Sequence, residues 1–136
     1  MNTTISTTCI IDDDHIYVFG TKKIMEATNF CNDFIIYKNG KEAVDNLVPM
    51  ILSGDKLPDV ILLDLNMPIM DGWQVLDELV KTPTNQKIRI YIVSSSVDSA
   101  DLERSKSYSL VSSYIIKPFS IDKINELMDH LEKGML

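Results

Sequence analysis

The sequence predicts an α/β fold in which helices cover both faces of a five-stranded parallel sheet. Short runs rich in Ile and Val alternate with stretches of helical spacing, and 136 residues are about enough for one domain. A strict alternation of strands and helices favours a parallel sheet with crossover helices. No repeat and no Pro/Gly-rich seam divides the chain, so we expect one domain over residues 1–136 with its core at about 7–133.

Five short apolar runs are predicted to form the strands. Most are continuous and rich in Ile and Val, which is typical of strands that are covered on both faces. In chain order they are Thr8–Ile11, Phe34–Tyr37, Val60–Leu63, Ile88–Val93 and Ser113–Ile116. Right-handed crossovers leave few topologies for such a sheet.

Five segments are predicted to be helices, and the second, third and fifth of them have the spacing of amphipathic helices. The five segments cover about 16–28, 41–53, 72–81, 98–109 and 121–133. Leu52 and Ile121 are expected on the apolar faces of the second and fifth helices, and Pro49 predicts a kink or break in the second. Asp71 and Gln74 form a variant of the capping box at the start of the third. The fourth helix has little apolar material within a serine-rich stretch, so we expect it to be the most labile.

Composition and charge argue against several classes of function. The chain has 13 Lys and Arg against 20 Asp and Glu, a net charge of −7. Such a protein repels phosphate backbones and anionic lipids, so we expect neither a nucleic acid nor a membrane as its partner. No window approaches the roughly 18–20 apolar residues of a membrane span, and the polar N-terminus lacks the apolar core of a signal peptide. With only two cysteines, a cytoplasmic location is expected.

Polar side chains follow four of the five predicted strands. They are Asp12–Asp14 after the first strand, Asp64 after the third, Ser94–Ser96 after the fourth and Lys117 after the fifth. Because the carboxyl ends of parallel strands meet at the ligand-binding edge of such sheets, we expect these side chains to converge.

The expected cluster has the chemistry of a phosphoryl site. Neighbouring carboxylates repel by about 1–4 kcal/mol per close pair near a surface, so the pattern predicts a hard divalent cation such as Mg²⁺. Lys117 supplies a fixed positive charge. A carboxylate in the centre can act as a nucleophile towards phosphorus, and the surrounding charges favour phosphoryl transfer.

The chain resembles the receiver domain of two-component response regulators from about residue 7 to residue 133. The motifs that carry the resemblance are Asp12-Asp13, Asp64-Leu65-Asn66-Met67-Pro68-Ile69-Met70-Asp71-Gly72 and Tyr114-Ile115-Ile116-Lys117-Pro118-Phe119. The resemblance implies a doubly wound, flavodoxin-like sheet with the strand order 2-1-3-4-5. It also implies a signalling switch that is itself phosphorylated, rather than an enzyme for external substrates.

The resemblance implies a role for each residue of the cluster. Asp64 would accept the phosphoryl group from a sensor histidine kinase or a phosphotransfer protein, and Lys117 would pair with a phosphoryl oxygen. Mg²⁺ would be bound by Asp13 and Asp64 directly, by Asp12 mainly through water, and by the main-chain carbonyl of Asn66. The bond between Lys117 and the following proline is expected to be cis.

Two serines compete for the role of the switch hydroxyl, which in this family moves toward the phosphoryl group. Continuity with the apolar run 90–93 favours Ser94, whereas counting back from Lys117 by the commonest loop length points to Ser95. We favour Ser94, because strand register fixes a side chain better than loop length does. By the same resemblance, Tyr114 would turn inward when the hydroxyl moves.

The implied output is a protein contact. No residues after the fifth helix would form a DNA-binding unit, so we expect a stand-alone receiver that acts on an effector protein or passes phosphate on in a relay. The fourth helix, fifth strand and fifth helix would form the regulated surface, and the first helix would dock the kinase.

A haloacid-dehalogenase-type phosphatase is disfavoured because position 66 is Asn instead of a second Asp. A pseudo-receiver is disfavoured because Asp13, Asp64 and Lys117 are all present.

Overall fold

Five parallel strands form one sheet in the order β2-β1-β3-β4-β5, which confirms the predicted topology. The computed structural model describes residues 5–135. The strands are β1 (Thr7–Ile11), β2 (Asp33–Tyr37), β3 (Val60–Leu63), β4 (Arg89–Ser94) and β5 (Val111–Ile116). β1, β3 and β4 occupy the middle of the sheet, which explains why their sequences are continuous apolar runs.

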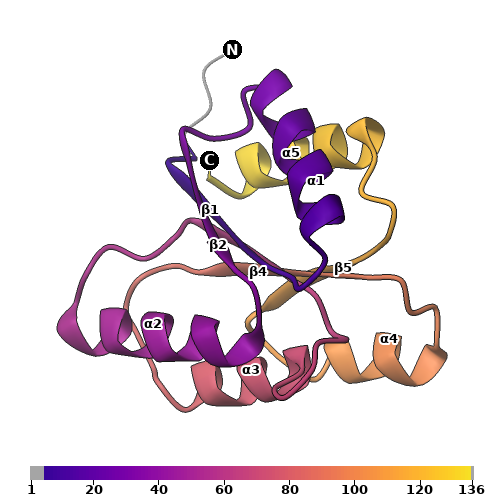
Figure 1. The fold of residues 1–136 in the computed structure, drawn as a ribbon. Helices are drawn as coiled ribbons and strands as arrows, with labels where there is room; N and C mark the ends of the chain where they lie inside the picture. The colour runs from indigo at the N-terminus through magenta and orange to yellow at the C-terminus, as the bar shows by residue number, and fades with distance from the viewer. Residues whose placement is uncertain (1–4, 136) are drawn as a thin grey trace.

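Five helices cover the two faces of the sheet. They are α1 (His15–Ala27), α2 (Gly40–Ser53), α3 (Gly72–Val80), α4 (Ser99–Ser105) and α5 (Ile121–Met135). Figure 1 shows α1 and α5 on one face and α2, α3 and α4 on the other. Within residues 5–135, no helix combines the length and the apolar character that crossing a bilayer requires.

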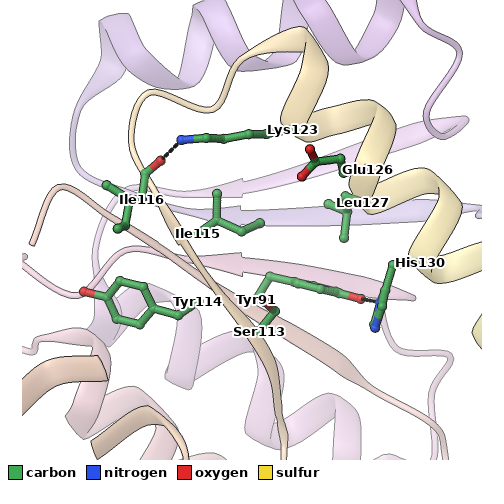
Figure 2. A pocket seen from close by; sticks show the side chains of 9 residues that line it. All are labelled: Tyr91, Ser113, Tyr114, Ile115, Ile116, Lys123, Glu126, Leu127 and His130. Carbon is green, nitrogen blue, oxygen red and sulfur yellow. Dashed lines mark hydrogen bonds between the residues drawn. The ribbon is translucent and has the colours of Figure 1, made fainter. Parts of the chain in front are cut away.

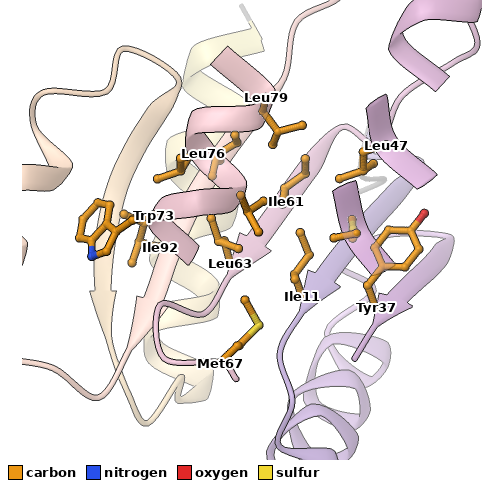
Figure 3. Close-up of a cluster of buried hydrophobic side chains, with 14 of the residues drawn as sticks. Ile11, Tyr37, Leu47, Ile61, Leu63, Met67, Trp73, Leu76, Leu79 and Ile92 are labelled. Carbon is orange, nitrogen blue, oxygen red and sulfur yellow. The ribbon is translucent and has the colours of Figure 1, made fainter. Parts of the chain in front are cut away.

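The alternation of side chains along the central strands builds two separate cores. Ile11, Leu63 and Ile92 point toward α2 and α3, where Trp73 and Leu76 are among the buried residues of that core (Figure 3). Their strand neighbours Ile10, Leu62 and Tyr91 belong to the other core, which also contains buried residues of α1 and α5. Because both faces are covered, the strands are held in register and their carboxyl ends are aligned.

Two expectations about the helix boundaries are corrected. α4 ends at Ser105 instead of about residue 109, and the hydroxyls of Ser105 and Ser107 donate to the carbonyls of Leu102 and Arg104. Such side-chain bonds to the backbone compete with helix propagation. Pro49 does not break α2, which runs from Gly40 to Ser53.

Two predicted core positions lie at the surface. Leu52 is 75% exposed and Ile121 is 52% exposed, whereas Leu127 is buried on the inner face of α5. The strands also differ at their ends, because β4 extends to Ser94 and β5 starts at Val111. These shifts of one or two residues leave the carboxyl edge of the sheet as the sequence predicts it.

The predicted cap of α3 is present. The carboxylate of Asp71 accepts a hydrogen bond from the backbone N–H of Gln74, and the Gln74 side chain accepts one from the backbone N–H of Asp71, both at 2.9 Å. This capping box fixes the start of α3 directly after the loop that follows β3.

Candidate functional site

Three carboxylates meet where the first and third strands end. The backbone N–H of Asp12 donates to Tyr37 and that of Asp64 donates to Ile11, so both residues extend the pairing of the sheet by one step. One oxygen from each of Asp12, Asp13 and Asp64 lies within 4.8 Å of the others. Asp12 and Asp64 are buried and Asp13 is exposed, which leaves the cluster open to solvent on one side.

Lys117 completes the cluster from β5. Its backbone N–H donates to the carbonyl of Ser94, and its peptide bond to Pro118 is cis as expected. The Nζ atom lies 2.9 Å from Asp12 Oδ2 and 3.7 Å from Asp64 Oδ1. Burial by itself would lower the pKa of Lys117, but the hydrogen bond and charge of Asp12 and the charge of Asp64 outweigh it and raise the pKa. Lys117 therefore remains an ammonium ion.

Asp64 carries an electrostatic penalty when it is ionised. Burial, followed by the charge of Asp12, raises the pKa of Asp64 to about 6, although Lys117 and the backbone N–H of Asn66 act in the opposite direction. A single ammonium thus does not compensate the buried carboxylates. A further positive charge beside Asp64 would relieve this penalty.

The donor set fits a hard divalent cation. Three carboxylate oxygens within one small volume are ligands that Mg²⁺ prefers, and the exposed side of the cluster leaves room for waters and a phosphate. Asp12 Oδ1 also accepts a hydrogen bond from the backbone N–H of Asp14 at 3.0 Å, which orients the Asp12 carboxylate. Asn66 lies two residues after Asp64 in the exposed part of the same loop.

The loop between β3 and α3 folds tightly around Asp64. The backbone N–H of Gly72 donates to the carbonyl of Leu65, and Ile69 adopts a positive φ of 72°. A Cβ atom on Gly72 would lie 2.5 Å from the carbonyl oxygen of Asp64. Gly72 is part of a motif in the sequence, but only the structure reveals its role, which is to let α3 start in contact with the backbone of Asp64.

The structure separates the two serines that compete for the switch role. Ser94 is the last residue of β4 and is fully buried, whereas Ser95 is exposed. The Ser94 hydroxyl oxygen accepts a hydrogen bond from the backbone N–H of Ser96 at 3.1 Å. The strand end therefore holds Ser94 in the interior and directs Ser95 toward solvent.

Ser96 links this loop to α4 and β5, a connection that sequence analysis misses. Its hydroxyl donates to Asp101 Oδ2 at 2.7 Å, and its carbonyl accepts a hydrogen bond from the Tyr114 hydroxyl at 2.9 Å. A continuous set of hydrogen bonds thus connects Ser94 with the first turn of α4 and with β5. Only the conformation of the loop, which local sequence does not reveal, brings these groups together.

A cavity of about 440 Å³ lies between β5 and α5, away from the carboxylates. Figure 2 shows Tyr114 on one side of it, with Lys123 and His130 from α5 on the other. The Tyr91 hydroxyl is 2.8 Å from His130 Nδ1 at one end of the cavity. Tyr114 lines this cavity, and its hydroxyl also bonds to Ser96, so one side chain contacts both the cavity and the loop after β4.

The comparisons with known proteins all point to the same family. The model of the "Response regulator receiver domain" matches residues 8–129. The probable methanogenesis regulatory protein FilR2 of Methanothrix harundinacea is 27% identical over 127 residues, which cover 93% of this chain and 81% of that protein.

Solved structures of response regulators share the fold of this chain. The crystal structure of a two-component response regulator from Cytophaga hutchinsonii has a TM-score of 0.82 and 27% identity, with 95% of this chain and 98% of that chain covered. A response regulator receiver protein from Dyadobacter fermentans has a TM-score of 0.76 and 25% identity, with 92% and 96% covered. The family match over most of the chain and the shared fold lead to one conclusion: the chain belongs to the response regulator receiver domain family.

Proposed function

We propose that the chain is a phosphorylation-dependent switch in which Asp64 accepts the phosphoryl group. One observation carries this proposal: the buried Asp64 carboxylate lies 3.7 Å from the Lys117 ammonium and within 4.8 Å of oxygens of Asp12 and Asp13 at the carboxyl edge of the sheet. The whole chain would act as one receiver domain.

In the proposed reaction, an oxygen of Asp64 forms a bond to phosphorus while the bond from phosphorus to the nitrogen of a phosphohistidine donor breaks. The donor nitrogen keeps the electron pair of the broken bond. Asp64 must be ionised to attack, and its pKa of about 6 leaves most of it ionised at pH 7. Lys117 keeps its proton and moves from Asp12 toward a phosphoryl oxygen, whose charge it offsets.

We propose that Asp12, Asp13 and Asp64 hold Mg²⁺, with the main-chain carbonyl of Asn66 as a further ligand. Held by these residues, Mg²⁺ would supply positive charge that offsets the repulsion between the Asp64 carboxylate and the phosphoryl oxygens. The raised pKa of Asp64 and the mutual proximity of the three carboxylates support this assignment.

Mg²⁺ is expected to stabilise the protein against unfolding. At a concentration ten times a millimolar Kd, binding to the folded state alone contributes about 1.4 kcal/mol, which raises Tm by about 4–7 °C. The measurement is thermal unfolding in MgCl₂ and in KCl of equal ionic strength.

Two charge-matched variants give the control for this prediction. Asp13→Asn removes a proposed ligand and should abolish the Mg²⁺ effect. Asp14→Asn removes the same charge from a residue that only caps α1, a role that Asn also fills, and should retain it. A Tm that is indifferent to Mg²⁺ in the unaltered protein contradicts the metal site.

The proposed partners are a sensor histidine kinase or phosphotransfer protein as donor and an effector protein or relay acceptor as output. We place the regulated surface on α4, β5 and α5, because the hydrogen bonds of Ser96 lead from Ser94 to Asp101 and Tyr114. A cytoplasmic location agrees with Cys9 and Cys31, which are both free thiols.

Ser94→Ala is expected to leave labelling of Asp64 largely intact but to uncouple it from the output surface. The alanine removes the hydroxyl that would bind the phosphoryl group and also the acceptor for the Ser96 backbone N–H. The measurement is the change in amide chemical shifts of Ser96, Asp101 and Tyr114 upon phosphorylation. Ser95→Ala, at the exposed neighbour, should preserve these changes; if it alone removes them, Ser95 is the switch hydroxyl.

Incubation with acetyl phosphate and Mg²⁺, followed by intact mass and peptide mapping, tests the proposed function. We expect one added phosphoryl group, on the peptide that contains Asp64. Continuous release of phosphate from unrelated phosphomonoesters would favour a hydrolase instead. Failure to take up phosphate from any high-energy donor would contradict the switch.

A further inference from the structure

We infer that Tyr17 is a positioning residue for Lys117, whose ammonium its aromatic ring keeps within the acid cluster during phosphoryl transfer. The Lys117 Nζ atom lies 4.1 Å from the centroid of the Tyr17 ring, which is the geometry of a cation–π contact. The inference rests on the proposed function, since it assigns a role to Tyr17 in the reaction at Asp64.

The backbone of Tyr17 is anchored in the first turn of α1. The carboxylate of Asp14 accepts hydrogen bonds from the backbone N–H groups of Ile16 and Tyr17, both at 3.1 Å, and thereby fixes the first turn of α1. The Tyr17 ring is half-buried and lines a small cavity that Asp12 and Asp64 also line. The ring therefore borders the acid cluster, and it comes from a different element than the residues that carry the charges.

Lys117 needs such a neighbouring ring because its ammonium must move during phosphoryl transfer. In the structure its Nζ atom is closer to Asp12 than to Asp64, and it must shift to reach a phosphoryl oxygen on Asp64. A lysine side chain has four rotatable bonds, so an ammonium that leaves one carboxylate can also turn toward water. The face of an aromatic ring attracts a cation without fixing one hydrogen-bond direction, and so it can retain the ammonium throughout the shift.

The test compares Tyr17→Phe, which keeps the ring and removes the hydroxyl, with Tyr17→Leu, which removes the ring. We expect the phosphorylation rate with acetyl phosphate at saturating Mg²⁺ to remain within about twofold for Phe and to fall about 3- to 30-fold for Leu, as the strength of a cation–π contact implies. The Kd for Mg²⁺ should not change, because Tyr17 is not a metal ligand.

Phe19→Leu gives a matched control. It removes an aromatic ring from the same helix, but Phe19 is 65% exposed and its ring lies 5.4 Å from the ammonium of Lys23 rather than near Lys117. Its phosphorylation rate should equal that of the unaltered protein. The side-chain chemical shifts of Lys117 provide a second readout, since they should lose their ring-current displacement in Tyr17→Leu and keep it in Tyr17→Phe.

A double-mutant cycle separates positioning from a general structural effect. In a Lys117→Met background, Tyr17→Leu should cause no further loss of rate, because its effect acts through the ammonium. Three outcomes overturn the inference: Tyr17→Leu reacts as fast as the unaltered protein, Tyr17→Phe is as slow as Tyr17→Leu, or Tyr17→Leu slows the Lys117→Met protein by the same factor. Should the unaltered protein itself take up no phosphate, it is the proposed function that fails.

Discussion

Asp64→Asn is expected to abolish phosphorylation and, at the same time, to stabilise the metal-free protein. The amide cannot attack phosphorus, so no label should appear on the peptide that contains residue 64. The gain in stability follows from the pKa of Asp64, which is raised to about 6 in the folded protein by burial and by the charge of Asp12. Replacing this carboxylate with a neutral group of the same shape removes the penalty of ionising it.

The pH dependence of this gain has a definite sign. Below pH 4 Asp64 is protonated in both the folded and the unfolded chain, so the variant and the unaltered protein should be equally stable. Between pH 4 and pH 6 the unfolded chain ionises first, and the unaltered protein loses stability relative to the variant. Above pH 6 the difference should reach about 2–3 kcal/mol, since one pKa unit corresponds to about 1.4 kcal/mol.

Urea unfolding in EDTA at several pH values measures this difference directly. Because other groups titrate equally in both proteins, only the difference between their free energies of unfolding reports on Asp64. A variant that is less stable than the unaltered protein at pH 7 would mean that the contact with Lys117 outweighs burial, contrary to the pKa of Asp64. Added Mg²⁺ should narrow the gap, because it stabilises only the protein with the intact carboxylate.

Gly72→Ala is expected to damage both the fold and the acceptor site. The added Cβ would lie 2.5 Å from the carbonyl oxygen of Asp64 and 2.9 Å from the Cα atom of Leu65, and neither backbone atom can move without shifting the loop. Overpacking of this kind costs about 1–3 kcal/mol. Displacement of the Asp64 backbone by about 1 Å should slow phosphorylation by about 100-fold.

Gly20→Ala, a second glycine-to-alanine change in the same protein, is expected to increase stability and to leave phosphorylation unchanged. Gly20 lies inside α1, and a Cβ atom there would meet nothing within 4 Å. Alanine is the better helix former, so this variant should be more stable by about 1 kcal/mol and should be phosphorylated at the normal rate by acetyl phosphate. Comparing the two variants by urea unfolding and by labelling separates the steric role of Gly72 from the general effect of adding a methyl group. If Gly72→Ala matches Gly20→Ala in both measurements, the close contact with Asp64 does not matter.

Much of the acid cluster is predictable because it follows from the geometry of parallel strands. Once the apolar runs are aligned, the residues directly after them must meet at one edge, and Asp12, Asp64 and Lys117 do so. β3 matches its predicted bounds because Val60–Leu63 is a continuous apolar run between polar segments. These features depend on backbone register, which hydrophobic patterning determines.

The contacts of Ser96, Tyr17 and Gly72 are not predictable in the same way. Each depends on the path of a loop or on the direction of a side chain, and neither leaves a periodic signal in the sequence. The early end of α4 has a similar cause, since serine hydroxyls bond to nearby carbonyls there. The expectation that residues up to 109 are helical is therefore wrong for a local reason, although α4 itself is present.

The ion pair between Lys117 and Asp12 joins residues that are 105 positions apart in the chain. A growing chain therefore contains Asp12 long before Lys117, which supplies its counter-charge, has been added. The buried carboxylates of Asp12 and Asp64 gain this nearby positive charge only when β5, the last strand, has joined the sheet. Completion of the acid cluster therefore depends on almost the whole chain.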